Sequence, residues 1–200
     1  MPPKRRKPVT LRFFTIVAAA FLVSSASAAT VSFTGNFSAD DDKQIFHYNV
    51  LNQGSVSVST TSFATGGFIP VLSLFDPAGN FLFLDSGYAN NTDASLNWVS
   101  NAGTTYTIVL TEYDNFPNGL LLSDGFTEDG QGNFTTALSG FPGPFRDPLG
   151  TQLSGNWAVT FSSADPTLEA SPVPEPAAAL LAGPGMLLLF WLRRKRAARA

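Results

Sequence analysis

Residues 29–164 carry the alternation of apolar and polar side chains that is typical of β-strands. In 44–51, Phe46, Tyr48 and Val50 share one face, and 55–60 alternates strictly. No helical period of useful length appears in this region, so we expect an all-β fold, a single antiparallel β-sandwich or jelly roll. The other expected strands are 31–37, 71–75, 81–84, 95–99, 104–112 and 156–161.

Two turn sequences predict β-hairpins. Asp76-Pro77-Ala78-Gly79-Asn80 has the Asp, Pro and Gly positions of a type I turn, between the strands 71–75 and 81–84. The stretch 101–103, Asn-Ala-Gly, predicts a second hairpin between 95–99 and 104–112.

The stretch 114–155 is rich in Gly, Pro, Asn and Asp and contains at most one strand, at 134–138. Connections of this length are uncommon in compact domains and are usually functional loops or disordered. Large apolar residues such as Phe126 and Phe145 argue against disorder. We expect a loop packed over one edge or end of the sandwich.

The first 28 residues have the organisation of a secretory signal. A basic cluster at 4–7 precedes an apolar run at 13–23, and Ala26 and Ala28 form the small-residue site of a signal peptidase. A permanent N-terminal anchor is the alternative, but the run is short for a bilayer. Arg5-Arg6 is compatible with a twin-arginine signal, although 7–9 fits that motif poorly.

The last 36 residues, 165–200, predict a second membrane-directed segment. A Pro-rich linker at 165–176 leads to an apolar run at 177–192 and a basic tail at 193–200. Sixteen helical residues reach about 24 Å, short of a hydrocarbon core of about 30 Å. The positive-inside rule places the tail in the cytoplasm and the β-domain outside.

This C-terminal region resembles the PEP-CTERM sorting signal of exported bacterial proteins. The matching parts are the motif Pro174, Glu175 and Pro176, the apolar run, and a basic stop cluster, in that order at the end of the chain. The resemblance implies transient residence in the inner membrane, processing by an exosortase, and delivery to the cell surface or to an extracellular exopolysaccharide or biofilm matrix. The basic stop cluster consists of Arg193, Arg194, Lys195 and Arg196.

The middle of the chain is similar to the β-sandwich of bacterial pre-peptidase C-terminal (PPC-like) domains. The similarity lies in Asp41-Asp42 before a strand ending at Val50, in 66–68, in 70–76 and in 105–111. PPC-like domains commonly have an acidic residue just before the Pro of the third stretch, where this chain has Ile69, and this departure bears on any calcium site.

Charge is divided unevenly along the chain. Residues 29–192 contain two basic and fifteen acidic residues, a net charge of −13. Such a segment repels phosphate backbones, so we expect no nucleic-acid partner and favour cations or neutral polymers. The chain has no cysteine, so the domain must be stabilised by core burial, in which phenylalanine, with eighteen residues in the full chain, takes the main part.

We expect no required cofactor, but calcium is a possible ligand. Asp40, Asp41 and Asp42 are the densest acidic cluster, and Asp114, with Glu112 or Asn115, could complete an oxygen site. The alternative is a solvated acidic turn. Asp124, Glu128 and Asp129 form a second, weaker candidate.

Catalytic candidates are few, and we expect no enzyme. His47, the single histidine, has no Gly-x-Ser-x-Gly motif to accompany it. Glu112 and Asp114 have the residue types of a glycosidase pair, but that chemistry requires two carboxyl groups facing each other across a cleft.

Aromatic residues offer a possible sugar-stacking surface. The candidates are Trp98, Tyr113, Phe116 and Trp157. Trp157 is expected in the core, and Tyr113 and Phe116, at the start of the long loop, are the better surface candidates. We therefore expect a structural or adhesive matrix protein. The alternatives are a polysaccharide-binding module, calcium-dependent or not, and a secreted hydrolase.

Overall fold

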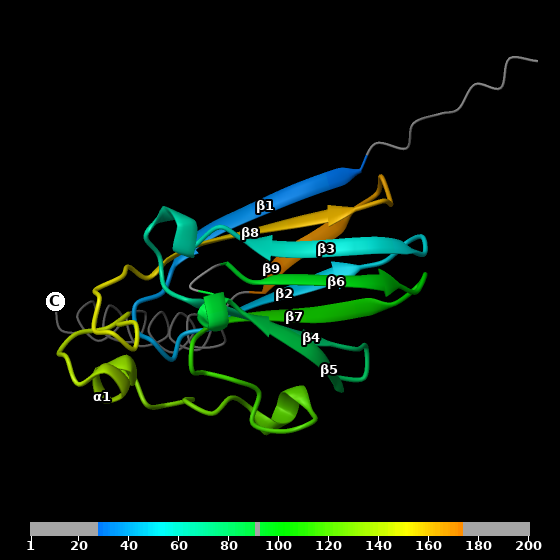
Figure 1. Cartoon of the computed structure of the whole chain (residues 1–200). Coiled ribbons are helices and arrows are strands. Elements are labelled where there is room, and N and C mark those ends of the chain that lie inside the picture. Colours follow the sequence, from blue (N-terminus) through cyan, green and yellow to red (C-terminus); the bar gives the residue numbers. More distant parts are fainter. Residues whose placement is uncertain (1–27, 91–92, 174–200) are drawn as a thin grey trace, which may run out of the picture.

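A computed structural model describes residues 28–90 and 93–173. The alternating segments form strands of two antiparallel sheets that pack face to face (Figure 1). The first sheet has the order β1 (Ala29–Asn36), β8 (Asn156–Ser163), β3 (Gly54–Thr60) and β6 (Ser95–Ser100). The expected all-β sandwich is therefore confirmed.

The second sheet has five strands. Their order is β5 (Phe81–Ser86), β4 (Pro70–Phe75), β7 (Thr105–Glu112), β2 (Gln44–Asn49) and β9 (Glu169–Val173). Short helices occur only between strands in the described residues: η1 (Phe63–Thr65), η2 (Gly87–Asn90), η3 (Leu122–Asp124) and α1 (Thr135–Ser139).

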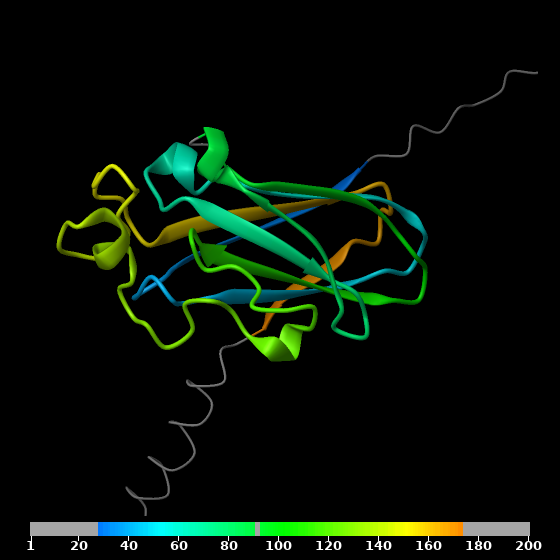
Figure 2. The same ribbon diagram turned by 60° about the horizontal axis from the view of Figure 1, so that its bottom comes forward.

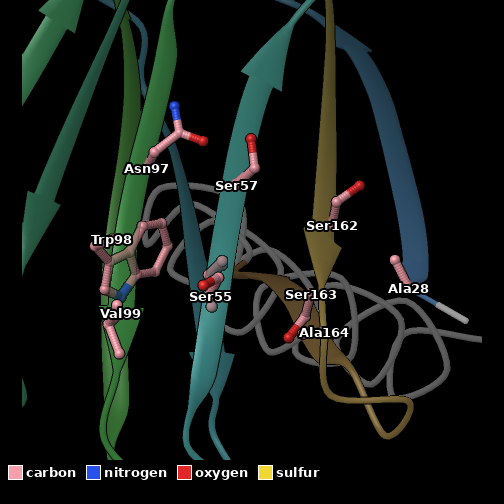
Figure 3. Close-up of a pocket in the computed structure, with 10 residues that line it drawn as sticks. Ala28, Ser55, Ser57, Asn97, Trp98, Val99, Ser162, Ser163 and Ala164 are labelled. Carbon is pink, nitrogen blue, oxygen red and sulfur yellow. The ribbon is translucent and has the colours of Figure 1, made fainter. Parts of the chain in front are cut away.

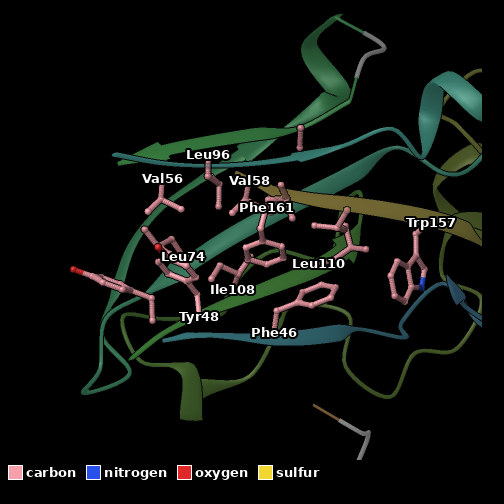
Figure 4. Packing of buried hydrophobic residues seen from close by; sticks show 14 of the residues in the cluster. Phe46, Tyr48, Val56, Val58, Leu74, Leu96, Ile108, Leu110, Trp157 and Phe161 are labelled. Atoms are coloured by element: carbon pink, nitrogen blue, oxygen red, sulfur yellow. The ribbon is translucent and has the colours of Figure 1, made fainter. Parts of the chain in front are cut away.

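The core fills the space between the two sheets (Figure 4). Phe46 of β2 contacts Phe161 and Trp157 of β8, with ring centroids 5.4 and 5.9 Å apart. Tyr48, Val58 and other side chains that the alternation placed inward are buried. Burial of each such side chain stabilises the folded state by about 1.5–3 kcal/mol. The chain has no cysteine, so no disulfide adds to this stabilisation.

The first predicted hairpin is confirmed. β4 pairs with β5, and the Gly79 amide donates to the Asp76 carbonyl at 2.9 Å. The Asp76 carboxylate also accepts from the amides of Ala78 and Asn80. Hydrogen bonds from the side chain and backbone of Asn80 lower the pKa of Asp76.

The second predicted hairpin is wrong, because the turn at 101–103 crosses between the sheets. β6 pairs with β3 in the first sheet, whereas β7 lies between β4 and β2 in the second. The Gly103 amide donates to the Val50 carbonyl at 2.8 Å, so the turn is attached to the chain leaving β2 rather than to β6. The side chains of β7 are buried on both faces, as suits the central strand of a sheet that is covered on both sides. Along β6, exposed side chains alternate with more buried ones, as suits a sheet with one face in water.

The long loop, residues 114–155, lies over the outer side of the second sheet and one end of the sandwich, as expected (Figure 2). Phe126 packs on Phe75 and Val109 outside the sheet, and Phe145 reaches the main core, 6.0 Å from Phe68. The strand expected at 134–138 is wrong. Thr135–Ser139 forms the helix α1 instead, which ends where Gly140 adopts a left-handed φ of 74°.

The sandwich extends beyond the boundary expected at residue 164. The segment 165–176 was expected to be an exposed linker, but Glu169–Val173 forms β9, which pairs with β2 along the sheet edge. Pro172 is tolerated there because an edge strand leaves half of its amides unpaired.

Both expected membrane-directed segments lie almost entirely outside the described residues. This applies to the signal 1–28 (apart from the exposed Ala28), to Pro174–Pro176, to 177–192 and to the tail. No helix within 28–90 and 93–173 is long and apolar enough to cross a membrane.

Candidate functional site at the end of strand β7

The predicted acidic residues meet at one end of the second sheet. Gln44 of β2 lies opposite Leu110 of β7, so the chain before β2 runs beside the chain that leaves β7. This register brings the segment 40–42 to the same end as Glu112 and Asp114.

Asp40 is fully buried and holds the long loop. Its carboxylate accepts hydrogen bonds from the Thr135 amide at 2.9 Å, from the Thr135 hydroxyl, and from the Phe145 amide at 2.7 Å. A buried carboxylate is tolerated when several donors satisfy it. Asp40 therefore joins the helix α1 and the turn at Phe145 to the sandwich.

The other two aspartates point to different partners. Asp42 accepts from the amides of Ser38 and Ala39 at 2.6 and 3.0 Å, and Asp41 accepts from the Gly132 amide at 2.9 Å. In the described part of the chain, no three acidic or histidine side chains are grouped as metal ligands. The calcium site at Asp40, Asp41, Asp42 and Asp114 stays a prediction.

Glu112 is an unusual buried acid at the last position of β7. Its side chain is 2% exposed, and its Oε2 has no hydrogen-bond partner among the described residues. Burial, and secondarily the charge of Asp40, raise the pKa of Glu112 well above its usual value. A carboxyl group so enclosed is poorly placed to reach a glycan, which weakens the glycosidase pairing with Asp114.

Asp114 lies closer to the surface and faces Glu128 of the long loop. Burial raises the pKa of Asp114; burial and then the charge of Asp114 raise the pKa of Glu128. Two hydrogen bonds join the first residues of the loop to its middle: the Glu128 amide donates to Asn115 Oδ1 at 2.9 Å, and the Thr127 hydroxyl donates to the Asp114 carbonyl at 3.0 Å.

An aromatic cluster, Tyr88, Tyr113 and Phe116, borders these carboxylates. The rings of Tyr88 and Tyr113 are 4.0 Å apart and nearly parallel, and Phe116 meets Tyr113 edge-on at 5.5 Å. Tyr88 is 41% exposed. Sequence reasoning found Tyr113 and Phe116 but missed Tyr88, because no local pattern links the η2 turn to the end of β7.

The remaining candidates have structural surroundings. Trp157 is a core residue, as expected, and Trp98 packs edge-on against Tyr48 and Tyr106. His47 is exposed on the outer face of β2, as the alternation predicted.

The second acidic candidate stabilises the long loop. Asp129 accepts from the Phe126 amide and forms an ion pair with Lys43, and Asp124 accepts from the Leu121 amide at 3.0 Å. Lys43 in turn lies 5.3 Å from the centre of the Phe126 ring. These two carboxylates are thus engaged in holding the loop.

No protein-family model matches this chain, and a search of curated proteins finds no match. Any functional conclusion therefore rests on the residues themselves.

Proposed function

We propose that this chain is an exported bacterial protein that an exosortase processes at a PEP-CTERM-like signal, with a structural or adhesive role in an extracellular polysaccharide matrix. The observation that carries the proposal is a succession of three parts along the sequence: the motif at 174–176, the apolar run 177–192 and the basic cluster 193–196. Signal peptidase and exosortase are its processing partners.

The extent of the folded domain is compatible with both cuts. β1 begins at Ala29, directly after the expected signal-peptidase site at Ala28, and β9 reaches Val173, the last residue that the structure describes before Pro174. Removal of 1–28 and of the segment after the motif would leave all the strands found within the described residues in the product.

Intact mass and cell fraction test this function in the native host, with and without its exosortase. The wild-type strain should yield a chain that starts at Ala29 and lacks the residues after the motif, in the extracellular fraction. The knockout should retain the full tail in the membrane fraction. A full-length tail in both strains would leave a membrane-tethered surface domain and end the sorting proposal.

Polysaccharide binding is the second candidate, and the exposed ring of Tyr88 favours it. Aromatic rings at a surface bind sugars by stacking, and the carboxylates of Asp114 and Glu128 nearby would accept hydroxyl hydrogen bonds. Calorimetric titration of the released protein with polysaccharides, with and without calcium, separates the candidates. A purely structural role predicts no saturable heat, whereas Tyr88→Ala should weaken binding at this cluster.

A further inference from the structure

The first sheet has an unusual composition, because none of its strands contains a charged residue. β1, β8, β3 and β6 include no Asp, Glu, Lys, Arg or His, although the segment 28–173 contains fourteen acidic residues. In typical soluble domains about 25% of all residues are charged. The outer face of this sheet is therefore a neutral surface on an acidic domain.

Strand register arranges the outward side chains of this face in cross-strand rows. Ser57 of β3 lies between Asn97 of β6 and Ser162 of β8, and Thr30 of β1 continues the row. With neighbouring strands about 4.8 Å apart, one row extends about 14 Å across the sheet.

A second row repeats the pattern one step along the strands. It consists of Ser95, Ser59, Thr160 and Ser32. The hydroxyls of Ser32 and Thr160 are 2.8 Å apart and bond to each other. Those of Ser57, Ser59 and Ser162 have no hydrogen-bond partner within the described residues, so they can bind a ligand.

Part of this face is hollowed into a shallow trough of about 570 Å³ (Figure 3). Three neighbouring strands line it, with Ser55 and Ser57 in the middle, Asn97 and Val99 on one side, and Ser162 on the other. Val99 is 62% exposed and, with Trp98 and Ala164, supplies apolar contacts beside the polar groups.

The chemistry of the face selects one class of partner. A hydroxyl both donates and accepts hydrogen bonds, so rows of Ser and Thr complement the hydroxyls of a sugar polymer. Because the face has no charged side chain, a ligand that covers it does not have to remove water from an ion. That desolvation would cost several kcal/mol per ion. The acidic remainder of the domain repels an anionic polymer, and a cationic one would prefer the carboxylates elsewhere.

We propose that the outer face of the first sheet binds a neutral polysaccharide that lies in the trough across β6, β3 and β8. This inference rests on the proposed matrix function and names its partner. The site is distinct from the aromatic cluster, which lies at the end of the second sheet.

Binding of the full-length protein to dextran, a soluble neutral glucan, and to insoluble cellulose tests the inference, with alginate as the anionic comparison. We expect saturable binding to a neutral glucan and none to alginate. Ser57→Glu, which places a charge in the middle of the first row, should weaken binding about tenfold or more. Asn49→Asp on the exposed outer side of β2, in the other sheet, should leave it unchanged.

Several results would overturn the inference. These are no binding of the wild-type chain to either glucan, wild-type affinity in Ser57→Glu, or loss of binding in Tyr88→Ala alone. A change of oligomeric state in Ser57→Glu, measured by sedimentation, would instead assign the face to a second copy of the chain. If Ser57→Glu does not fold, judged by its thermal midpoint, Asn97→Glu on the edge strand β6 places the charge in the same row and in the trough.

The sorting experiment remains independent of this one. A chain that is cleaved and released normally but does not bind glucan overturns only the binding inference. A chain that binds glucan but keeps its tail in the wild-type host overturns only the sorting proposal.

Discussion

Asp40 is the residue on which the attachment of the long loop depends. Its buried carboxylate satisfies two backbone amides and one hydroxyl from segments far away in the sequence. From sequence, the same residue is indistinguishable from its neighbours Asp41 and Asp42, because burial depends on where the loop returns.

We expect Asp40→Ala to lower the free energy of unfolding by about 3 kcal/mol, because it leaves the amides of Thr135 and Phe145 buried without an acceptor. Urea unfolding measures the change. Asp41→Ala, which removes a single bond from the Gly132 amide, should cost less than about 1 kcal/mol. Equal effects of the two substitutions would contradict the role given to Asp40.

Glu112 should make the domain less stable as pH rises. Its pKa is raised in the folded state, so the folded chain holds this proton more tightly than the unfolded chain. The stabilisation is complete below the unfolded-state value near 4.5 and is lost as pH rises through the folded pKa. Glu112→Gln should flatten the dependence of the unfolding free energy on pH above 4.5 and raise stability at pH 7. An unchanged slope would mean that Glu112 is ionised in the folded protein.

At the level of elements, alternation predicted the strands well but not their partners. The burial of Phe46 and Tyr48, and the exposure of His47, follow from the period of two in 44–51. The Asn-Ala-Gly stretch at 101–103 has the same turn chemistry whether the chain returns to the same sheet or crosses to the other. The choice depends on the pairing of β7 with β4 and β2, which is a long-range property.

β9 escaped prediction because its composition is that of a linker. Pro172 and the small residues Ala170 and Ser171 give no alternating signal, and its strand conformation comes from the free edge of β2. A chain that ends at Leu168 should therefore be less stable than one that ends at Val173 by about 2–4 kcal/mol, since each lost backbone bond contributes about 1 kcal/mol. Thermal unfolding of the two chains measures this, and identical midpoints would show that β9 adds nothing.

The long loop should depend on Phe126, which is 5% exposed and packs against Phe75 and Phe81. Phe126→Ala should cost about 3 kcal/mol and expose the loop to proteolysis within 114–155. Phe141→Ala, at a ring that is 51% exposed, serves as the matched control and should change stability by less than about 0.5 kcal/mol. Intact resistance to protease in Phe126→Ala would mean that Asp40 and Asn115 suffice to hold the loop.

The whole domain combines a high negative charge with a core that has no covalent cross-links. Residues 28–173 carry fourteen acidic and two basic side chains, and this mutual repulsion opposes the compact state. Raising sodium chloride from about 0.01 to 0.15 M shortens the Debye length from about 30 to 8 Å. We expect the thermal midpoint to rise by about 2–4 °C, which corresponds to about 1 kcal/mol.

The thermal midpoint in calcium chloride, compared with that in sodium chloride at the same ionic strength, tests the calcium prediction. A further rise that Asp114→Asn abolishes would support an ion at the end of β7. Midpoints that depend on ionic strength alone would mean that screening accounts for the effect.

The end of β9 at Val173 also limits how far the sandwich can stand from a bilayer. Under the proposed topology only the residues 174–176 separate this strand from the apolar run, and three residues reach about 10 Å at most. The headgroup layer alone takes up about 5–8 Å. The uncut domain would rest directly on the lipid headgroups, so an enzyme that cuts at the motif would have to approach it from within the membrane rather than from the water.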